Sequence, residues 1–295
     1  MSESFQLKNR GIQILKILKD NGPLSFRGLK TIISPEIKDR RLHGSLARLV
    51  VKGLVTKRQE RVFRGAGVFY QLTQNDSLRE RIAFLLGCST VDLRQPFFRS
   101  RELMHTESCA LWAHKLQALF PSAKLIRDFQ FYRDDRVHEV MLTQKNEYEL
   151  LPDLLMILDG TMGGPKVSVA FEIERSRKSK SRILTKLRKY ADETVLDGVV
   201  YLCESEQISE PVALIYKTKI STKSLRISHY GDCFLLLTKQ MEASEQEKIK
   251  MYTSNGSDVS LEAWIDNFLK IPLTLRRSKN FEVGAVSCSH FDKFA

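Results

Sequence analysis

Cysteine is scarce in this 295-residue chain, and its five copies are widely scattered. No pair shows C-x-x-C spacing, and the six histidines form no H-E-x-x-H motif. The sequence therefore encodes neither a disulfide framework nor a zinc site. Its glycine pairs lack the strand-to-helix context of a phosphate loop, which disfavours nucleotide hydrolysis.

Long apolar segments are also missing. No run of about 18 apolar residues is present, and the N-terminus lacks the charged-then-apolar pattern of a signal peptide. We expect a soluble, cytoplasmic protein with no membrane partner. The length allows two domains, each with its own hydrophobic core.

Cations are abundant and unevenly distributed. The chain carries a formal net charge of +12, and its first 75 residues hold 15 lysines and arginines against 5 acids, a local net charge of +10. Most of the excess thus lies in the first quarter of the chain. Such a concentration is typical of a module that binds a polyanion such as nucleic acid.

The basic quarter has the pattern of three helices and a hairpin. Apolar spacing predicts helices over 8–19, 25–33 and 36–52, and strands over 54–59 and 68–72. This order resembles a winged helix-turn-helix, which implies that the third helix enters the major groove of duplex DNA. The expected DNA-binding arginines of the third helix and hairpin are Arg40, Arg41, Arg48, Arg58, Arg61 and Arg64. Arg41 and Arg48 are expected to reach base edges. Two alternatives stay open: a protein-binding module and a merely solvated basic face.

Three carboxylates are expected to converge in the second half of the chain. A strand over 151–158 carries Asp153 at its start, and a strand over 166–174 alternates apolar residues with Glu172 and Glu174. The period of two places both glutamates on one face. Carboxylate oxygens suit Mg²⁺ or Mn²⁺, so Asp153 and Glu172 are the expected metal ligands. Such an ion polarises a phosphodiester and activates water.

The same block resembles the PD-(D/E)XK nuclease superfamily. Glu174 stands where that pattern has lysine. On the following helix, Ile183, Leu187 and Tyr190 share the buried face and Lys186 borders it. Lys186 is therefore the expected replacement for that lysine, with Lys189 next, and Tyr190 follows Lys186 by one turn. Glu107 matches an accessory carboxylate of the superfamily. The competing interpretation makes both strand glutamates a solvated face, paired on the surface with Arg175, Arg177 and Lys178. Arg175 and Arg177 are otherwise expected to bind the DNA backbone.

We expect an α+β protein: a winged helix-turn-helix followed by an α/β restriction-endonuclease-like domain with a mixed sheet. The predicted domains are a DNA-binding domain (1–75), a helical connector (76–102), a nuclease-like domain (103–240), and a C-terminal helix with a loosely ordered tail (241–295). Further strands are predicted over 212–217 and 233–237, and a helix over 261–269.

The order of these parts over residues 8–205 resembles the replication-relaxation family of plasmid proteins, which includes MobC-type mobilisation proteins. The resemblance implies binding to origin DNA, a role in conjugation or replication, and a relaxase or another relaxosome protein as partner. It implies that the protein either assists or performs Mg²⁺-dependent DNA nicking. The alternative is a non-catalytic DNA-binding regulator or relaxosome scaffold with a degenerate nuclease fold. The oligomeric state is left open.

Overall fold

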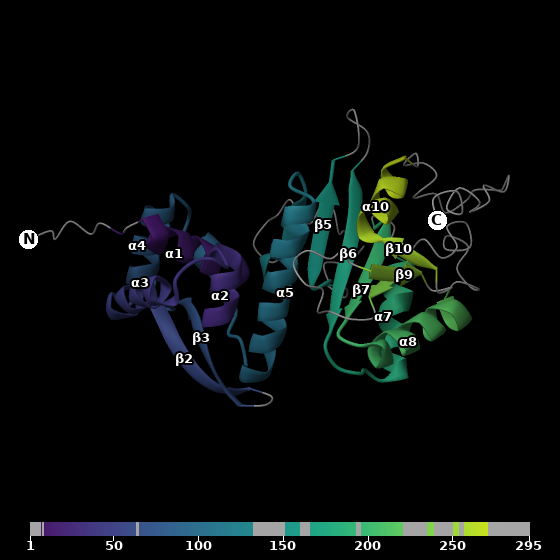
Figure 1. Cartoon of the computed structure of the whole chain (residues 1–295), viewed down its shortest axis with the longest axis horizontal. Helices are drawn as coiled ribbons and strands as arrows, with labels where there is room; N and C mark the ends of the chain where they lie inside the picture. The colour runs from purple at the N-terminus through teal and green to yellow at the C-terminus, as the bar shows by residue number, and fades with distance from the viewer. Residues whose placement is uncertain are drawn as a thin grey trace, which may run out of the picture. The chain divides into compact units, whose positions relative to one another are not determined.

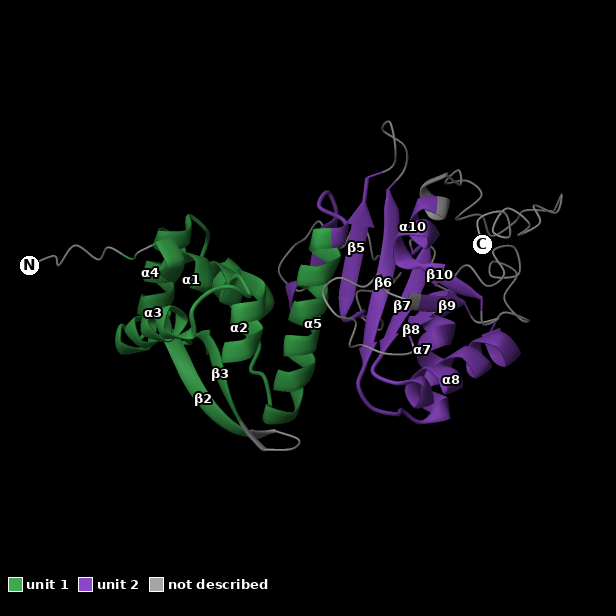
Figure 2. Ribbon diagram, viewed as in Figure 1, with its two compact units in different colours: residues 1–118 green, residues 119–295 purple. Residues whose placement is uncertain are grey.

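The computed structural model describes residues 7, 9–62, 65–131, 151–159, 166–192, 196–220, 235–238, 250–253 and 257–270. The chain divides into two compact units, unit 1 (Met1–Ala118) and unit 2 (Leu119–Ala295), which are coloured separately in Figure 2. The expected domain boundaries at 75, 102 and 240 stay a prediction. Within the described ranges, no helix is both long and apolar enough to cross a membrane.

Unit 1 combines helices with a small antiparallel sheet (Figure 1). Its main elements are α1 (Asn9–Asn21), β1 (Leu24–Ser25), α2 (Phe26–Ile33), α3 (Asp39–Val51), β2 (Val55–Val62), β3 (Gly65–Leu72), α4 (Asp76–Leu86) and α5 (Ser100–Leu119). The strand order is β1-β3-β2, with both pairings antiparallel. The predicted helices and hairpin are therefore present, with β2 and β3 longer than expected.

Local sequence explains how these elements begin and pack. Ser25 caps α2, because its hydroxyl oxygen accepts a hydrogen bond from the backbone N–H of Gly28 at 3.1 Å. Leu42, Leu46 and Leu49 of α3 are buried in the core of unit 1. Their helical spacing leaves the opposite face of α3 exposed to solvent.

Unit 2 is built on one mixed sheet. Its elements are β4 (Lys124–Arg127), β5 (Leu154–Leu158), β6 (Val167–Glu174), α7 (Lys180–Asp192), β7 (Gly198–Cys203), α8 (Glu206–Ile215), β8 (Leu235–Thr238), β9 (Lys250–Thr253), β10 (Asp258–Ser260) and α10 (Leu261–Lys270). Among the described residues, seven strands follow the order β10-β9-β8-β7-β6-β5-β4. The β6–β7 and β7–β8 pairs are parallel, and the other pairs are antiparallel. The expected α+β class with a mixed sheet is confirmed.

Helices α7 and α8 pack on one face of this sheet (Figure 1). Leu187 of α7 and Val212 of α8 share a buried cluster with Ala170 of β6. Because side chains alternate along a strand, Glu172 projects from the same face as Ala170 and therefore toward α7. The core packing thus places Glu172 on the face of the sheet that α7 covers.

The predicted strand over 212–217 is wrong. Residues 206–215 form α8, and Tyr216–Ile220 continue as one turn of π-helix. Val212 and Ile215 are buried while Leu214 between them is 59% exposed, which is the pattern of a helix rather than a buried strand. The other two predictions hold in part: β8 covers residues 235–238, and α10 covers 261–270. The tail after residue 275 lies outside the described residues.

Candidate carboxylate and lysine site

Asp153 is held at the start of β5, beside β6. The antiparallel register pairs Leu154 with Phe171, which places the residue before β5 opposite Glu172. Asp153 Oδ2 accepts a hydrogen bond from the backbone N–H of Ile173 at 2.7 Å. The hydrogen bond therefore holds the Asp153 carboxylate next to the strand that carries the two glutamates.

Glu172 is the buried centre of the site, with a residue exposure of 1%. The Lys186 ammonium donates a hydrogen bond to Oε2 of Glu172. The Tyr190 hydroxyl donates to Oε1. Both partners lie on α7, four residues and hence about one turn apart. The structure thus brings Glu172, Lys186 and Tyr190 together, and the solvated-face interpretation does not hold for Glu172.

Glu174 lies at the edge of this group. Its side chain is 13% exposed, and one oxygen lies 3.5 Å from Nζ of Lys178. Burial raises the pKa of Glu174, and Lys178 and Lys186 oppose this shift. Lys178 therefore pairs with Glu174 as the surface interpretation expected, although the carboxylate itself is largely covered.

The basic residues after β6 have mixed environments. The Arg175 guanidinium lies 3.8 Å from a carboxylate oxygen of Glu204, with side-chain exposures of 30% and 48%. Arg177 is exposed. DNA binding by these two arginines stays a prediction.

Burial dominates the electrostatics of Glu172. It raises the pKa of Glu172 to about 8, against the opposing effect of the Lys186 charge and with a further increase from Asp153. Glu172 therefore retains its proton through neutral pH. Burial alone would lower the pKa of Lys186, but its interactions with Glu172, Asp153 and Glu174 outweigh burial and raise it. Lys186 is thus the cation shared by all three predicted carboxylates.

Tyr201 is a member of the site that sequence reasoning missed. It lies on β7 directly opposite Glu172 in the parallel register, and it is 1% exposed. Its hydroxyl has no hydrogen-bond partner among the described residues. The apolar run of β7 predicts a buried strand but gives no sign of a polar site, so only strand pairing reveals this contact.

The predicted accessory carboxylate, Glu107, lies on α5 in unit 1. It is 8% exposed, and it accepts a hydrogen bond from the hydroxyl of Ser25. A Cβ added at Gly28 would collide with this carboxylate, so α2 approaches α5 closely at that point. Its role as an accessory site residue stays a prediction.

The predicted DNA-binding arginines of unit 1 fall into three groups. Arg40, Arg41 and Arg48 are exposed on α3. Arg58 is held within unit 1, because its guanidinium donates to the Glu60 carboxylate, the Gln71 side chain and the Phe98 carbonyl. The Arg61 side chain and the whole of Arg64 lie outside the described residues.

The donor set of unit 2 fits a hard cation in kind, because it consists of carboxylate oxygens. The charge of these groups, however, does not suit a cation as they stand. Glu172 is uncharged while it holds its proton, and Lys186 and Tyr190 already donate to its two oxygens. Asp153 and Glu172 would hold a Mg²⁺ ion only after Glu172 loses its proton and its bond to Lys186.

Comparison with family models, curated proteins and solved structures found no match to this chain. The resemblances found in the sequence therefore stay predictions.

Proposed function

We propose that this chain is a DNA-binding protein of plasmid mobilisation or replication, in which unit 1 binds an origin-type duplex site and unit 2 assists DNA nicking. The observation that carries the proposal is the exposed basic face of α3, with Arg40, Arg41 and Arg48, next to a sheet of order β1-β3-β2. Three helices followed by a hairpin are the arrangement expected of a winged helix-turn-helix.

In this proposal α3 enters the major groove and the β2–β3 hairpin lies along the backbone. Arginine suits both tasks, because its planar fork can bind guanine or phosphate through two hydrogen bonds. Arg58 has a different task. Its bonds to Glu60 and the Phe98 carbonyl, together with the bond from Ser100 to Glu60, tie β2 to the segment before α5 and orient the hairpin.

The first candidate role of unit 2 is Mg²⁺-dependent nicking, for which the shared position of Asp153, Glu172, Glu174 and Lys186 is the support. A bound ion would polarise the scissile phosphate and lower the pKa of a water molecule. The chain's own residues would divide the remaining work: Asp153 and Glu172 bind the ion, Lys186 binds the phosphate, and Tyr190 orients Glu172. The β5–β6–β7 arrangement, antiparallel then parallel with α7 after β6, is compatible with a PD-(D/E)XK frame.

The second candidate role is a non-catalytic scaffold for a relaxase or another relaxosome protein. Its support is the state of Glu172, which is buried and bound at both oxygens. Lys186 donates a hydrogen bond to Glu172, and its ammonium would have to leave that oxygen before it could bind a phosphate. In this role the nuclease-like frame survives as a structural platform.

A nicking assay on supercoiled plasmid with the cognate mobilisation region, in Mg²⁺ or Mn²⁺, tests both roles. The variants are Asp153→Ala and Glu172→Gln, with Glu210→Gln, an exposed acid on α8, as the matched control. Relaxation by wild type and control, lost in both site variants without loss of DNA affinity, supports the enzyme. Wild-type protein that binds the duplex and leaves it supercoiled supports the scaffold. Wild-type protein that does not bind the duplex refutes the proposed function.

A further inference from the structure

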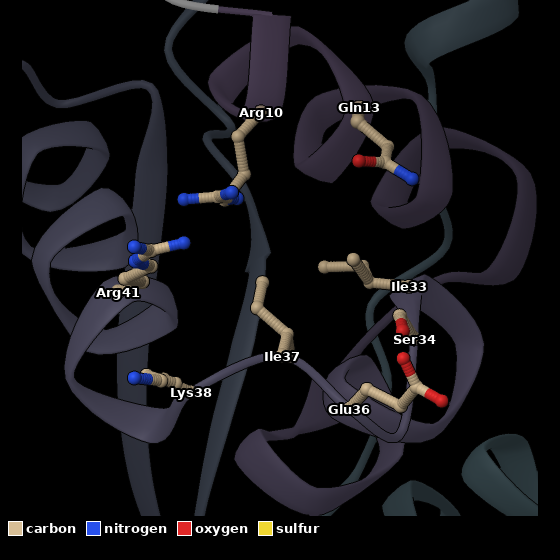
Figure 3. Close-up of a pocket in the computed structure, with 8 residues that line it drawn as sticks. All are labelled: Arg10, Gln13, Ile33, Ser34, Glu36, Ile37, Lys38 and Arg41. Carbon is tan, nitrogen blue, oxygen red and sulfur yellow. The ribbon is translucent and has the colours of Figure 1, made fainter.

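Two arginines of unit 1 line one pocket that the sequence did not indicate. The pocket has a volume of about 380 Å³ and lies between α1, the α2–α3 turn and the start of α3. Arg10 comes from the first turn of α1, and Arg41 comes from the first turn of α3. Both guanidinium groups point to the same side of the pocket (Figure 3). Lys38, the N-cap residue of α3, also lines the pocket, so cations from α1 and from the start of α3 meet there.

No carboxylate of the described residues neutralises this pair. Neither Arg10 nor Arg41 forms an ion pair with a described residue. Asp39, which lies near Arg41 in the sequence, is paired with Lys30 at 2.8 Å. The carboxylate of Glu36 also lines the pocket, but it lies on the opposite side from the two guanidinium groups, beyond Ile37 (Figure 3). Two like charges held together in this way are complemented by an anion.

The lining favours a phosphate among anions. Guanidinium groups offer N–H donors in a planar fork that matches phosphate oxygens. Ile33 and Ile37 provide an apolar wall on another side of the pocket.

The position of the pocket at the first turn of α3 indicates which molecule would supply this phosphate. Arg41 directly follows Arg40, and Arg48 lies about two turns further along the exposed face of α3. A duplex that contacts α3 through Arg40 and Arg48 therefore brings its backbone to the first turn of the helix, where the pocket lies. A backbone phosphate is the anion that this geometry delivers to the pocket.

We propose that Arg10 and Arg41 together bind one backbone phosphate of duplex DNA. The inference rests on the proposed DNA-binding function and deepens it. It assigns Arg41 to backbone positioning, in place of the base contact expected from sequence, and leaves base edges to Arg40 and Arg48. Contacts to phosphate fix the register of a protein on DNA but carry no sequence information.

The test measures affinity by fluorescence anisotropy, over a salt series, for the cognate origin duplex and for an unrelated duplex. The variants are Arg10→Gln, Arg41→Gln and the double variant, with Arg94→Gln as a control, because Arg94 is exposed in unit 1 outside the pocket. Each single variant is expected to bind both duplexes about tenfold more weakly, as loss of a hydrogen bond to a charged group predicts. The double variant should bind little more weakly than either single variant. A plot of log K against the logarithm of the salt concentration has a negative slope, and in the double variant this slope should be shallower by about 0.9, the value for one phosphate.

Several results would overturn the inference. Multiplicative losses in the double variant, with a slope change of about 1.8, mean that two separate phosphates are bound. Losses confined to the cognate duplex mean that the arginines contact bases. If no pocket variant changes the affinity for DNA, the phosphate site is refuted while the proposed function stands. If the wild type binds no duplex, both the phosphate site and the proposed function are refuted.

A second measurement separates DNA phosphate from free phosphate. Thermal unfolding is followed with and without inorganic phosphate. Without phosphate, the variants should unfold at the wild-type temperature, because Arg41 is exposed, Arg10 is partly exposed, and neither forms an ion pair with a described residue. If inorganic phosphate stabilises the wild type but not the double variant, and all variants bind DNA equally, the pocket belongs to a free phosphate ligand and the inference is wrong.

Discussion

Glu172→Gln should remove a large pH dependence from the stability of unit 2. The substitution keeps the shape of the side chain and removes its ability to ionise. Burial raises the pKa of Glu172 from 4.5 to about 8 in the folded protein. The unfolded chain therefore loses this proton at a lower pH than the folded chain, and stability falls as pH rises between these two values.

The pKa difference sets the size of the effect. Stability that is fully present below pH 4.5 falls by about 1.4 kcal/mol per pH unit and levels off above the folded pKa. Over the whole interval the loss is on the order of 5 kcal/mol. Glu172→Gln should resemble wild type at acid pH, because both side chains are then neutral. It should become progressively more stable than wild type toward pH 9.

The assay is urea unfolding at a series of pH values, followed by the fluorescence of Trp264, a buried residue of α10 in unit 2. Trp112→Phe in all proteins removes the signal from unit 1, because the chain has two tryptophans. Glu210→Gln, at an exposed position of α8, is the matched control and should follow wild type at every pH.

One result would refute this reasoning. If Glu172→Gln and wild type give parallel stability curves from pH 5 to pH 9, Glu172 is already ionised in the folded protein at pH 5. The charge of Lys186 and the hydrogen bond from Tyr190 would then outweigh desolvation. Glu172 would be a ready anion at neutral pH, which would strengthen the candidate nuclease role of unit 2.

Three further predictions concern the neighbours of these residues. Lys186→Met removes the cation that opposes burial, so the fall in stability should extend above pH 8 in the same Trp264 assay; an unchanged curve would contradict the pairing with Glu172. Gly28→Ala should destabilise unit 1 by about 1 kcal/mol, measured by thermal unfolding, because the added methyl group displaces the Glu107 carboxylate from its hydrogen bond with Ser25. Adding Glu107→Ser should cost less than the sum of the two single effects, and strict additivity would argue against the clash. Tyr201→Phe should stabilise unit 2 by about 1 kcal/mol, since the hydroxyl is buried without a partner among the described residues; a loss of stability would show that the hydroxyl is bonded.

Local periodicity was enough to predict much of the candidate site. The period of two along residues 167–174 placed Glu172 and Glu174 on one face, and the helical period over 183–190 placed Tyr190 on the buried side with Lys186 at its border. These are short-range regularities, and the structure keeps them: Lys186 and Tyr190 both contact Glu172. The same local reasoning located the exposed arginines of α3.

Contacts between residues far apart in the sequence could not be predicted from local periodicity. Tyr201 meets Glu172 only because β7 joins β6 in parallel, and no local pattern specifies that neighbour. Arg58 was expected to bind DNA, yet Glu60, Gln71 and the Phe98 carbonyl share its guanidinium. The stretch 212–216 is apolar throughout, so its sequence is compatible with a strand, and only the exposure of Leu214 shows which face of α8 is buried.

Lys186 decides between the two roles of unit 2, because one ammonium group cannot fully satisfy both Glu172 and a DNA phosphate. While Glu172 holds its proton, the attraction between them is a hydrogen bond from a cation to a neutral carboxyl, which is weaker than an ion pair. Lys186 is then held less tightly, and its 29% exposed side chain lies within reach of an incoming anion. Above about pH 8 the carboxylate ionises and holds Lys186 more strongly. A phosphate should therefore compete for Lys186 best below that pH, whereas cation binding at Asp153 and Glu172 needs the ionised carboxylate. These opposed requirements make a scaffold the simpler role for the isolated protein, and they make the pH profile of plasmid relaxation a sharper test of the enzyme than its activity at one pH.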